Sequence, residues 1–131
     1  HGVYKPGNVK LTPKILANSQ KYVSENVGLA HNSLNFVFHG GSGSTPEEIK
    51  ESISYGVVKM NIDTDTQYTY TRAVADFMLK NYDQVLKVDG EVGSKKHYDP
   101  RVWMKLAEKR MAARIVEACQ DLRSAGRSLL R

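Results

Sequence analysis

The stretch that decides the fold covers residues 34–45 and reads LNFVFHGGSGST. Leu34 to Phe38 form a short apolar run with aromatic and β-branched residues, which predicts a buried strand that ends at His39. A glycine-rich turn follows. The next residues, Thr45-Pro46-Glu47-Glu48, supply an N-cap, a first-turn proline and a capping-box glutamate, so a helix begins there. The order is therefore strand, histidine, glycine turn and helix.

The glycine turn has the features of an anion-binding site. Glycines let backbone N–H groups approach a ligand without interfering side chains, and the N-terminus of the following helix favours negative charge. The turn lacks the Gly-Lys-Ser/Thr ending of a P-loop and the third glycine of a dinucleotide fingerprint. His39-Gly40-Gly41 is also typical of the oxyanion-hole turn of lipase-type hydrolases, but their G-x-S-x-G elbow is missing. A phosphate site and a purely structural glycine loop both remain open.

A second strand end follows shortly after the first. Gly56 ends the helix, and residues 57–62, VVKMNI, predict another strand. Asn61, near its end, can orient a substrate hydroxyl or carbonyl, and the N–H groups of Asp63 and Thr64 can hold phosphate oxygens. The alternative is an ordinary helix cap. Two such strand ends side by side favour one shared anion site.

The rest of the chain reads mainly as helix. The apolar residues of the first helix, Ile15, Leu16, Tyr22 and Val23, are expected to face a core. His31 and His97 lie in loop-like stretches and are expected to be exposed. The predicted segments are a helix over 12–27, a helix over 66–80, a short helix over 82–88, a flexible surface loop over 89–99 and a long last helix over 100–124.

The last helix carries an apolar stripe. Residues at this spacing form a core or an interface far more often than a cofactor site. The stripe consists of Val102, Trp103, Leu106, Met111, Ile115, Cys119 and Leu122.

Composition narrows the class of protein. The chain has 131 residues, 40% of them hydrophobic, a net charge of +5 and a single cysteine, Cys119. A lone cysteine excludes an internal disulfide and fits a reducing compartment, so we expect a cytoplasmic protein. No stretch has the pattern of a membrane span or a secretory signal. The basic residues are dispersed without a nucleic-acid-binding motif, which favours a solvated surface over nucleic-acid binding, with anionic substrates as the other possibility.

Helices alternate with strands at a spacing typical of βαβ units and a parallel sheet. Two strands alone do not make a stable parallel sheet, so we expect a partner segment to supply the others. His1 and His39, at successive strand ends, could share a Zn²⁺, although catalytic zinc usually has three protein ligands and no HExxH motif is present. Two structural histidines are the alternative.

Four motifs together resemble the class II fructose-bisphosphate aldolase family, in its C-terminal part. They are HGVYKPGNV at 1–9, FVFHGGSGST at 36–45, YGVVKMNIDTDTQ at 55–67 and YDPRVW at 98–103. The resemblance implies an α/β fold: the C-terminal portion of a zinc-dependent (β/α)₈ TIM barrel, a domain of roughly 250 residues, plus a long C-terminal helix. Residues 1–131 are then expected to be one segment of a single barrel domain whose N-terminal strands this chain lacks.

The resemblance also implies roles for individual residues. His1 and His39 correspond to zinc ligands, and the carbonyl groups of Gly2 and Gly40 to donors for a monovalent cation, K⁺ or Na⁺. Asn61 corresponds to the residue that contacts substrate beside the metal, and Arg101 to the arginine that binds the far phosphate in the neighbouring subunit of a homodimer. The implied substrate-binding set is Gly2, Lys5, Gly40, Gly41, Ser42, Asn61, Ile62, Asp63, Thr64 and Arg101.

The reaction implied by the resemblance is the reversible cleavage of fructose 1,6-bisphosphate into dihydroxyacetone phosphate and glyceraldehyde 3-phosphate, through an enediolate that zinc stabilises. The family's other zinc ligands, a His and a Glu, and its catalytic Asp and mobile-loop Glu have no counterpart here. We therefore expect this chain alone to be inactive and poorly folded without the N-terminal segment. A tagatose-bisphosphate aldolase and a non-catalytic basic interaction module are the alternatives, and YDPRVW favours the fructose enzyme.

Overall fold

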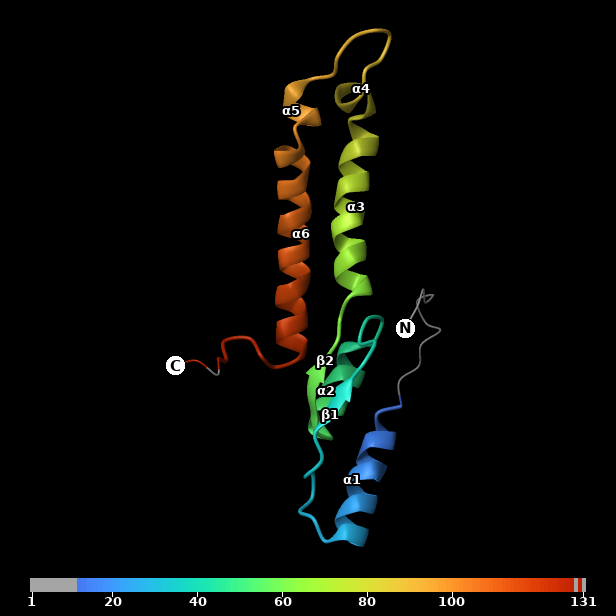
Figure 1. The fold of residues 1–131 in the computed structure, drawn as a ribbon, viewed down its shortest axis with the longest axis vertical. Coiled ribbons are helices and arrows are strands. Elements are labelled where there is room, and N and C mark those ends of the chain that lie inside the picture. Colours follow the sequence, from blue (N-terminus) through green and yellow to red (C-terminus); the bar gives the residue numbers. More distant parts are fainter. Residues whose placement is uncertain (1–11, 129, 131) are drawn as a thin grey trace. The chain divides into compact units, whose positions relative to one another are not determined.

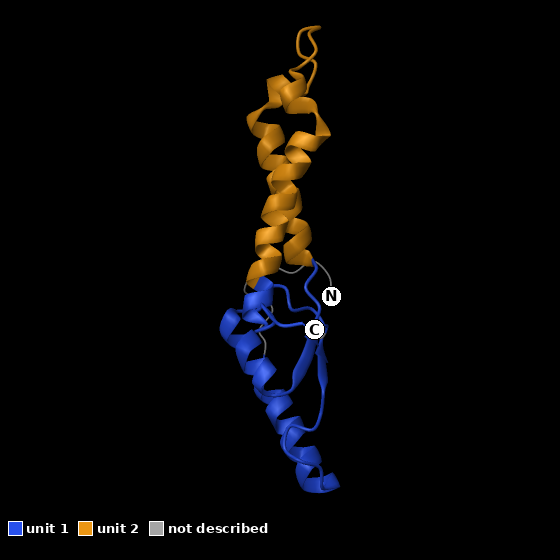
Figure 2. Ribbon diagram, turned by 90° about the vertical axis from the view of Figure 1, so that its left-hand side faces the viewer, with its two compact units in different colours: residues 1–63, 118–131 blue, residues 64–117 orange. Residues whose placement is uncertain are grey.

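The computed structural model describes residues 12–128 and residue 130. The chain divides into two compact units, coloured separately in Figure 2. One consists of residues 1–63 and 118–131, and the other of residues 64–117. The chain changes unit between β2 and α3, and the expectation that residues 1–131 are one segment of a single barrel domain stays a prediction.

The first unit contains the predicted strand–helix–strand order (Figure 1). The two strands pair in parallel, with Phe36 opposite Val57 and Phe38 opposite Met60, and α2 packs on β2. Both strands are shorter than the predicted 34–39 and 57–62. The elements of this unit are α1 (Lys14–Val27), β1 (Phe36–Phe38), α2 (Pro46–Ser54) and β2 (Val57–Met60).

A polar side chain, rather than an apolar one, joins α1 to the rest of the first unit. Gln20 is only 1% exposed. Its amide nitrogen donates to the carbonyl oxygens of Leu34, at 2.7 Å, and Tyr55, at 2.9 Å, and its amide oxygen accepts from the Leu34 N–H at 3.0 Å. The prediction that Ile15 and Tyr22 face a core was wrong, since they are 63% and 67% exposed. Two strands offer too little sheet to cover a helix face.

The second unit is a helical hairpin, in which α3 and α6 run side by side in both ribbon views. The range 89–99 is not simply the predicted loop, because it contains a helical turn, and Val88 and Glu91 form an antiparallel bridge. Predicted helix ends shift by two to three residues, as short terminal turns commonly do. The helices are α3 (Thr64–Lys80), α4 (Tyr82–Val85), α5 (Lys95–Tyr98) and α6 (Pro100–Asp121), whose last residues belong to the first unit.

His97 is an exception to the expected exposure of the loop histidines. Its ring stacks on Phe77 of α3, with the ring centroids 6.3 Å apart. The His97 N–H donates to the Ser94 carbonyl at 2.8 Å, which holds α5 in its turn. The prediction of a solvent-exposed His97 was therefore wrong, because α5 turns the ring inward, whereas His31 is exposed as predicted.

The apolar stripe of α6 is not a buried core in this chain. The buried residue of this helix within the hairpin is Ala107, at 0% exposure, while Leu106 and Ile115 are 46% and 43% exposed. The larger side chains of the stripe remain available for another surface. The prediction of an interface stays a prediction.

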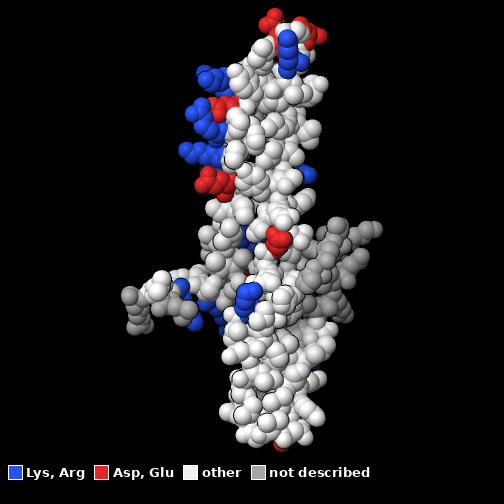
Figure 3. Space-filling model, viewed as in Figure 1, with Lys and Arg blue, Asp and Glu red and all other residues white. Residues whose placement is uncertain are grey.

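The surface charge is mixed. Figure 3 shows Lys and Arg side chains along the edge of the hairpin where Figure 1 draws α6, with Asp and Glu between them. Exposed Lys105, Glu108 and Lys109 illustrate this alternation. Within the described residues, no helix combines the length and apolar character needed to cross a membrane.

Candidate functional site

The carboxyl ends of the two parallel strands form the candidate site. His39 directly follows β1, and Asn61 directly follows β2. Because the strands are parallel, their ends meet at the same edge, where the Asn61 side-chain nitrogen lies 3.1 Å from His39 Nδ1. The structure thus brings together two of the residues that the sequence singled out.

The glycine turn is fixed against the end of β2. Gly40 has φ 74°, a left-handed conformation that favours glycine. The Gly41 N–H donates to the Asn61 carbonyl at 2.8 Å, and a Cβ on Gly41 would lie 2.6 Å from the Met60 side chain. The Gly41 N–H is therefore already paired within the protein. Because Gly41 has no side chain, a ligand can still approach the backbone closely at this position.

The predicted capping box of α2 is confirmed. Thr45 Oγ1 accepts from the Glu48 N–H at 3.2 Å, and Glu48 Oε2 accepts from the Thr45 N–H at 2.9 Å. A carboxylate therefore already occupies this helix terminus, so its attraction for a phosphate is weaker than we expected from the sequence.

Ser42 is 6% exposed, and the hydroxyl of Ser44 is buried with no hydrogen-bond partner in the described part of the chain. An unsatisfied buried hydroxyl marks the turn as a place that needs another polar group.

Lys59 is a site residue that sequence reasoning missed. Its ammonium group donates to Asn61 Oδ1, so the side-chain oxygen of Asn61 faces Lys59 while the nitrogen faces His39. Residues two apart in a strand share a face. A lysine within the apolar run Val57–Met60, two residues before Asn61, was the signal that could have found it.

Ile62, Asp63 and Thr64 follow Asn61 directly. Thr64 is the first residue of α3, two residues earlier than predicted, so its N–H lies in the first turn of a 17-residue helix. The N-terminal end of a helix favours negative charge. Asp63 and Thr64 are exposed and Ile62 is half-buried.

Arg101 lies in the first turn of α6, within the hairpin unit. Its guanidinium Nε donates to Asp99 Oδ1 at 2.9 Å, and its backbone N–H donates to the same oxygen at 3.0 Å. The Arg101 side chain is 83% exposed. The side-chain and backbone hydrogen bonds from Arg101 lower the pKa of Asp99 to about 2. Arg101 is therefore held at the surface by a neighbouring carboxylate.

Replacing Arg101 with Ala should raise the pKa of Asp99 from about 2 towards the ordinary aspartate value of 3.8. A carboxyl whose pKa is lowered by folding stabilises the fold above its unfolded pKa, and that contribution disappears as pH falls through the folded pKa. In the wild type the loss should thus occur between about pH 4 and pH 2. NMR titration of the Asp99 carboxyl measures this. An unchanged midpoint in Arg101→Ala would show that the guanidinium is not the cause.

Three of the predicted site residues, His1, Gly2 and Lys5, lie outside the described residues. Among residues 12–128 and 130, no three His, Cys, Asp or Glu side chains gather into a metal site. His39 is exposed at the end of β1, where an imidazole can bind a metal. The Asn61 NH₂ group can only donate, so its contact with His39 Nδ1 belongs to the metal-free histidine, because a zinc-bound histidine donates from its other ring nitrogen.

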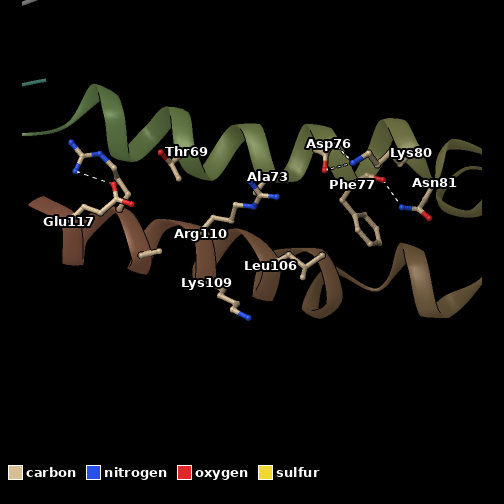
Figure 4. Close-up of a pocket in the computed structure, with 12 residues that line it drawn as sticks. Thr69, Ala73, Asp76, Phe77, Lys80, Asn81, Leu106, Lys109, Arg110 and Glu117 are labelled. Carbon is tan, nitrogen blue, oxygen red and sulfur yellow. Dashed lines mark hydrogen bonds and ion pairs between the residues drawn. The ribbon is translucent and has the colours of Figure 1, made fainter. Parts of the chain in front are cut away.

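A groove of about 680 Å³ lies between α3 and α6 of the hairpin (Figure 4). Phe77 and Leu106 contribute apolar surface to it. Two of its charged groups are paired, because the Lys80 ammonium lies 2.8 Å from the Asp76 carboxylate and thereby lowers the pKa of Asp76. The residues that line the groove include no histidine or cysteine, so the strand ends remain the candidate for chemistry.

Comparison with known proteins gives a consistent result. The family model described as fructose-bisphosphate aldolase class-II matches residues 1–127. Fructose-bisphosphate aldolases from Streptomyces coelicolor and Corynebacterium glutamicum are 62% and 58% identical, over 98% of this chain and 38% of their own length. A crystal structure of the Campylobacter jejuni fructose-bisphosphate aldolase matches with TM-score 0.76 and 48% identity, over 95% of this chain and 37% of that one. The chain thus spans about two fifths of the relatives that it matches.

Proposed function

Because the chain belongs to the class II fructose-bisphosphate aldolase family, we propose that it contributes to the reversible cleavage of fructose 1,6-bisphosphate into dihydroxyacetone phosphate and glyceraldehyde 3-phosphate. One observation from the structure supports this above the others. A histidine, an asparagine amide and a glycine turn meet at the carboxyl ends of neighbouring parallel strands. In β/α barrels, this is the edge at which catalytic groups collect.

The proposed metal is zinc, with His39 and His1 as ligands from this chain. A bound zinc ion supplies a Lewis acid for the ketone oxygen of the substrate. The two remaining ligands, and the groups that move the proton, would come from a segment that this chain does not contain. A monovalent cation, K⁺ or Na⁺, is proposed to lie on the carbonyl groups of Gly2 and Gly40, next to the phosphate.

The proposed roles of the chain's other residues are binding and orientation. A side-chain N–H of Asn61 would donate to the substrate oxygen on which negative charge develops, an interaction that counts most in the transition state. The phosphate of dihydroxyacetone phosphate would lie on the glycine turn. The residues proposed to line it are Gly2, Lys5, Gly40, Gly41, Ser42, Ile62, Asp63 and Thr64. The unsatisfied hydroxyl of Ser44 supports a polar ligand at this turn.

The hairpin unit is proposed to act at a subunit contact. Arg101 is exposed beside Asp99, and its proposed role is to bind the far phosphate in a neighbouring subunit. The half-exposed Leu106 and Ile115 of α6 would lose solvent contact in the assembled enzyme. We therefore propose a cytoplasmic homodimer of (β/α)₈ barrels in which the N-terminal segment completes each barrel.

The test is turnover by the full-length protein with fructose 1,6-bisphosphate and, separately, tagatose 1,6-bisphosphate. We expect faster cleavage of the fructose substrate, loss of activity when a chelator removes the metal, and recovery when zinc is restored. Faster cleavage of the tagatose substrate would identify the related aldolase. An intact protein without zinc and without turnover, which binds polyanions with a steep dependence on salt, would favour a basic interaction module.

A further inference from the structure

We propose that Lys59 is a positioning residue that fixes which way round the Asn61 amide lies. This inference rests on the proposed aldolase function, because it concerns how Asn61 is presented to substrate. Lys59 donates to Asn61 Oδ1, and Asn61 Nδ2 lies 3.1 Å from His39 Nδ1, so the three side chains form one line of hydrogen bonds. Lys59 does not act on substrate itself.

The backbone of Asn61 is already held on both sides. Its N–H donates to the Phe38 carbonyl at 2.9 Å, and its carbonyl accepts from the Gly41 N–H at 2.8 Å. The strand pairing and the glycine turn therefore fix the position of the Asn61 backbone, from which the side chain extends. The freedom that remains is rotation of the amide about its last bond, which exchanges the oxygen and the nitrogen.

An asparagine amide has nearly the same shape in its two orientations, so hydrogen-bond partners decide between them. A lysine ammonium can only donate. It accepts no hydrogen bond from an NH₂ group, and its charge repels the positive end of the amide dipole. With Lys59 in place, the oxygen of Asn61 faces the ammonium and the nitrogen faces His39.

The orientation matters because the two ends of the amide have opposite effects on an anionic oxygen. N–H donors stabilise negative charge that develops on a substrate oxygen, whereas the amide oxygen would repel it. The ammonium also polarises the amide, which makes its N–H groups stronger donors. Lys59 thus favours the one amide orientation that lowers the energy of the transition state.

The experiment is a double-mutant cycle in the full-length enzyme, with Lys59→Met, Asn61→Ala and the double variant. Partners of this kind typically contribute 10- to 100-fold, so we expect Lys59→Met to lower kcat about 10-fold or more, with little change in KM or zinc content. Lys59→Arg should restore most of the activity. In the Asn61→Ala background, Lys59→Met should cost less than about 2-fold, because Lys59 acts through the amide.

A matched control and a second readout separate this positioning role from a general effect of removing a lysine. Lys50→Met removes an exposed lysine from α2 and should leave kcat unchanged. In the metal-free protein, the ¹⁵N shift of His39 Nδ1 should report an acceptor nitrogen, and Lys59→Met should move that shift. An equal loss of kcat with and without Asn61, or no change in kcat and in the shift, would overturn the proposal. Wild-type turnover tests the aldolase function separately.

Discussion

Replacing His39 with Ala should remove most of the bound zinc and lower the rate of aldol cleavage by more than about 100-fold. This loss exceeds the one usual for a residue that only supports a metal ligand. The loss of one imidazole from a site with few protein ligands weakens metal binding directly. It also removes the group that Asn61 contacts at 3.1 Å, so the amide loses its neighbour at the strand end. Metal analysis of the purified full-length variant, together with kcat, measures both effects.

His31→Ala is the matched control for this experiment. His31 is exposed in the connection between α1 and β1, so its removal makes the same chemical change away from the strand ends. We expect this variant to keep its zinc and its activity. If His39→Ala also kept both, His39 would not be a ligand, and the proposed site would have to be abandoned.

The second large effect is on stability. Gly56→Ala should lower the free energy of unfolding by about 3 kcal/mol, measured by urea denaturation of the full-length protein. Gly56 has φ 96°, and a Cβ there would lie 2.6 Å from both the Leu34 carbonyl and the Gln20 amide nitrogen. The carbonyl is part of the backbone and cannot move aside without displacing the entry to β1.

Gly28→Ala provides the comparison, because it separates backbone strain from crowding. Gly28 caps α1 with a similar φ of 73°, but a Cβ there would meet nothing within 4 Å. Strain alone should cost about 1 kcal/mol. The difference in unfolding free energy between the two variants measures the crowding at the Gln20 junction, which is the place where the Gln20 amide contacts the backbone of Leu34 and Tyr55. Equal losses would show that this junction adjusts without cost.

Features set by neighbouring residues could be predicted from the sequence. The capping box at Thr45, the glycine turn and the parallel pairing of two strands all depend on short-range patterns, and the structure contains each of them. The family match confirms the resemblance that the four motifs indicated. The placement of His39 beside Asn61 follows from the parallel sheet alone, since the ends of parallel strands meet.

Features set by distant contacts could not be predicted. Gln20 looks like an ordinary surface residue of a helix, and only the positions of Leu34 and Tyr55 make it buried. A lysine in a strand is usually solvated, and the contact of Lys59 with Asn61 depends on side-chain geometry. His97 lies in a loop-like stretch of the sequence, and its stacking on Phe77 depends on the fold of the hairpin.

The Gln20 junction has a consequence for how this part of the protein can evolve. Gln20 hydrogen-bonds only to main-chain atoms of Leu34 and Tyr55 and not to their side chains. The attachment of α1 therefore does not depend on which side chains stand at positions 34 and 55. Positions 20 and 56 have no such latitude, because one supplies the amide and the other the room for it.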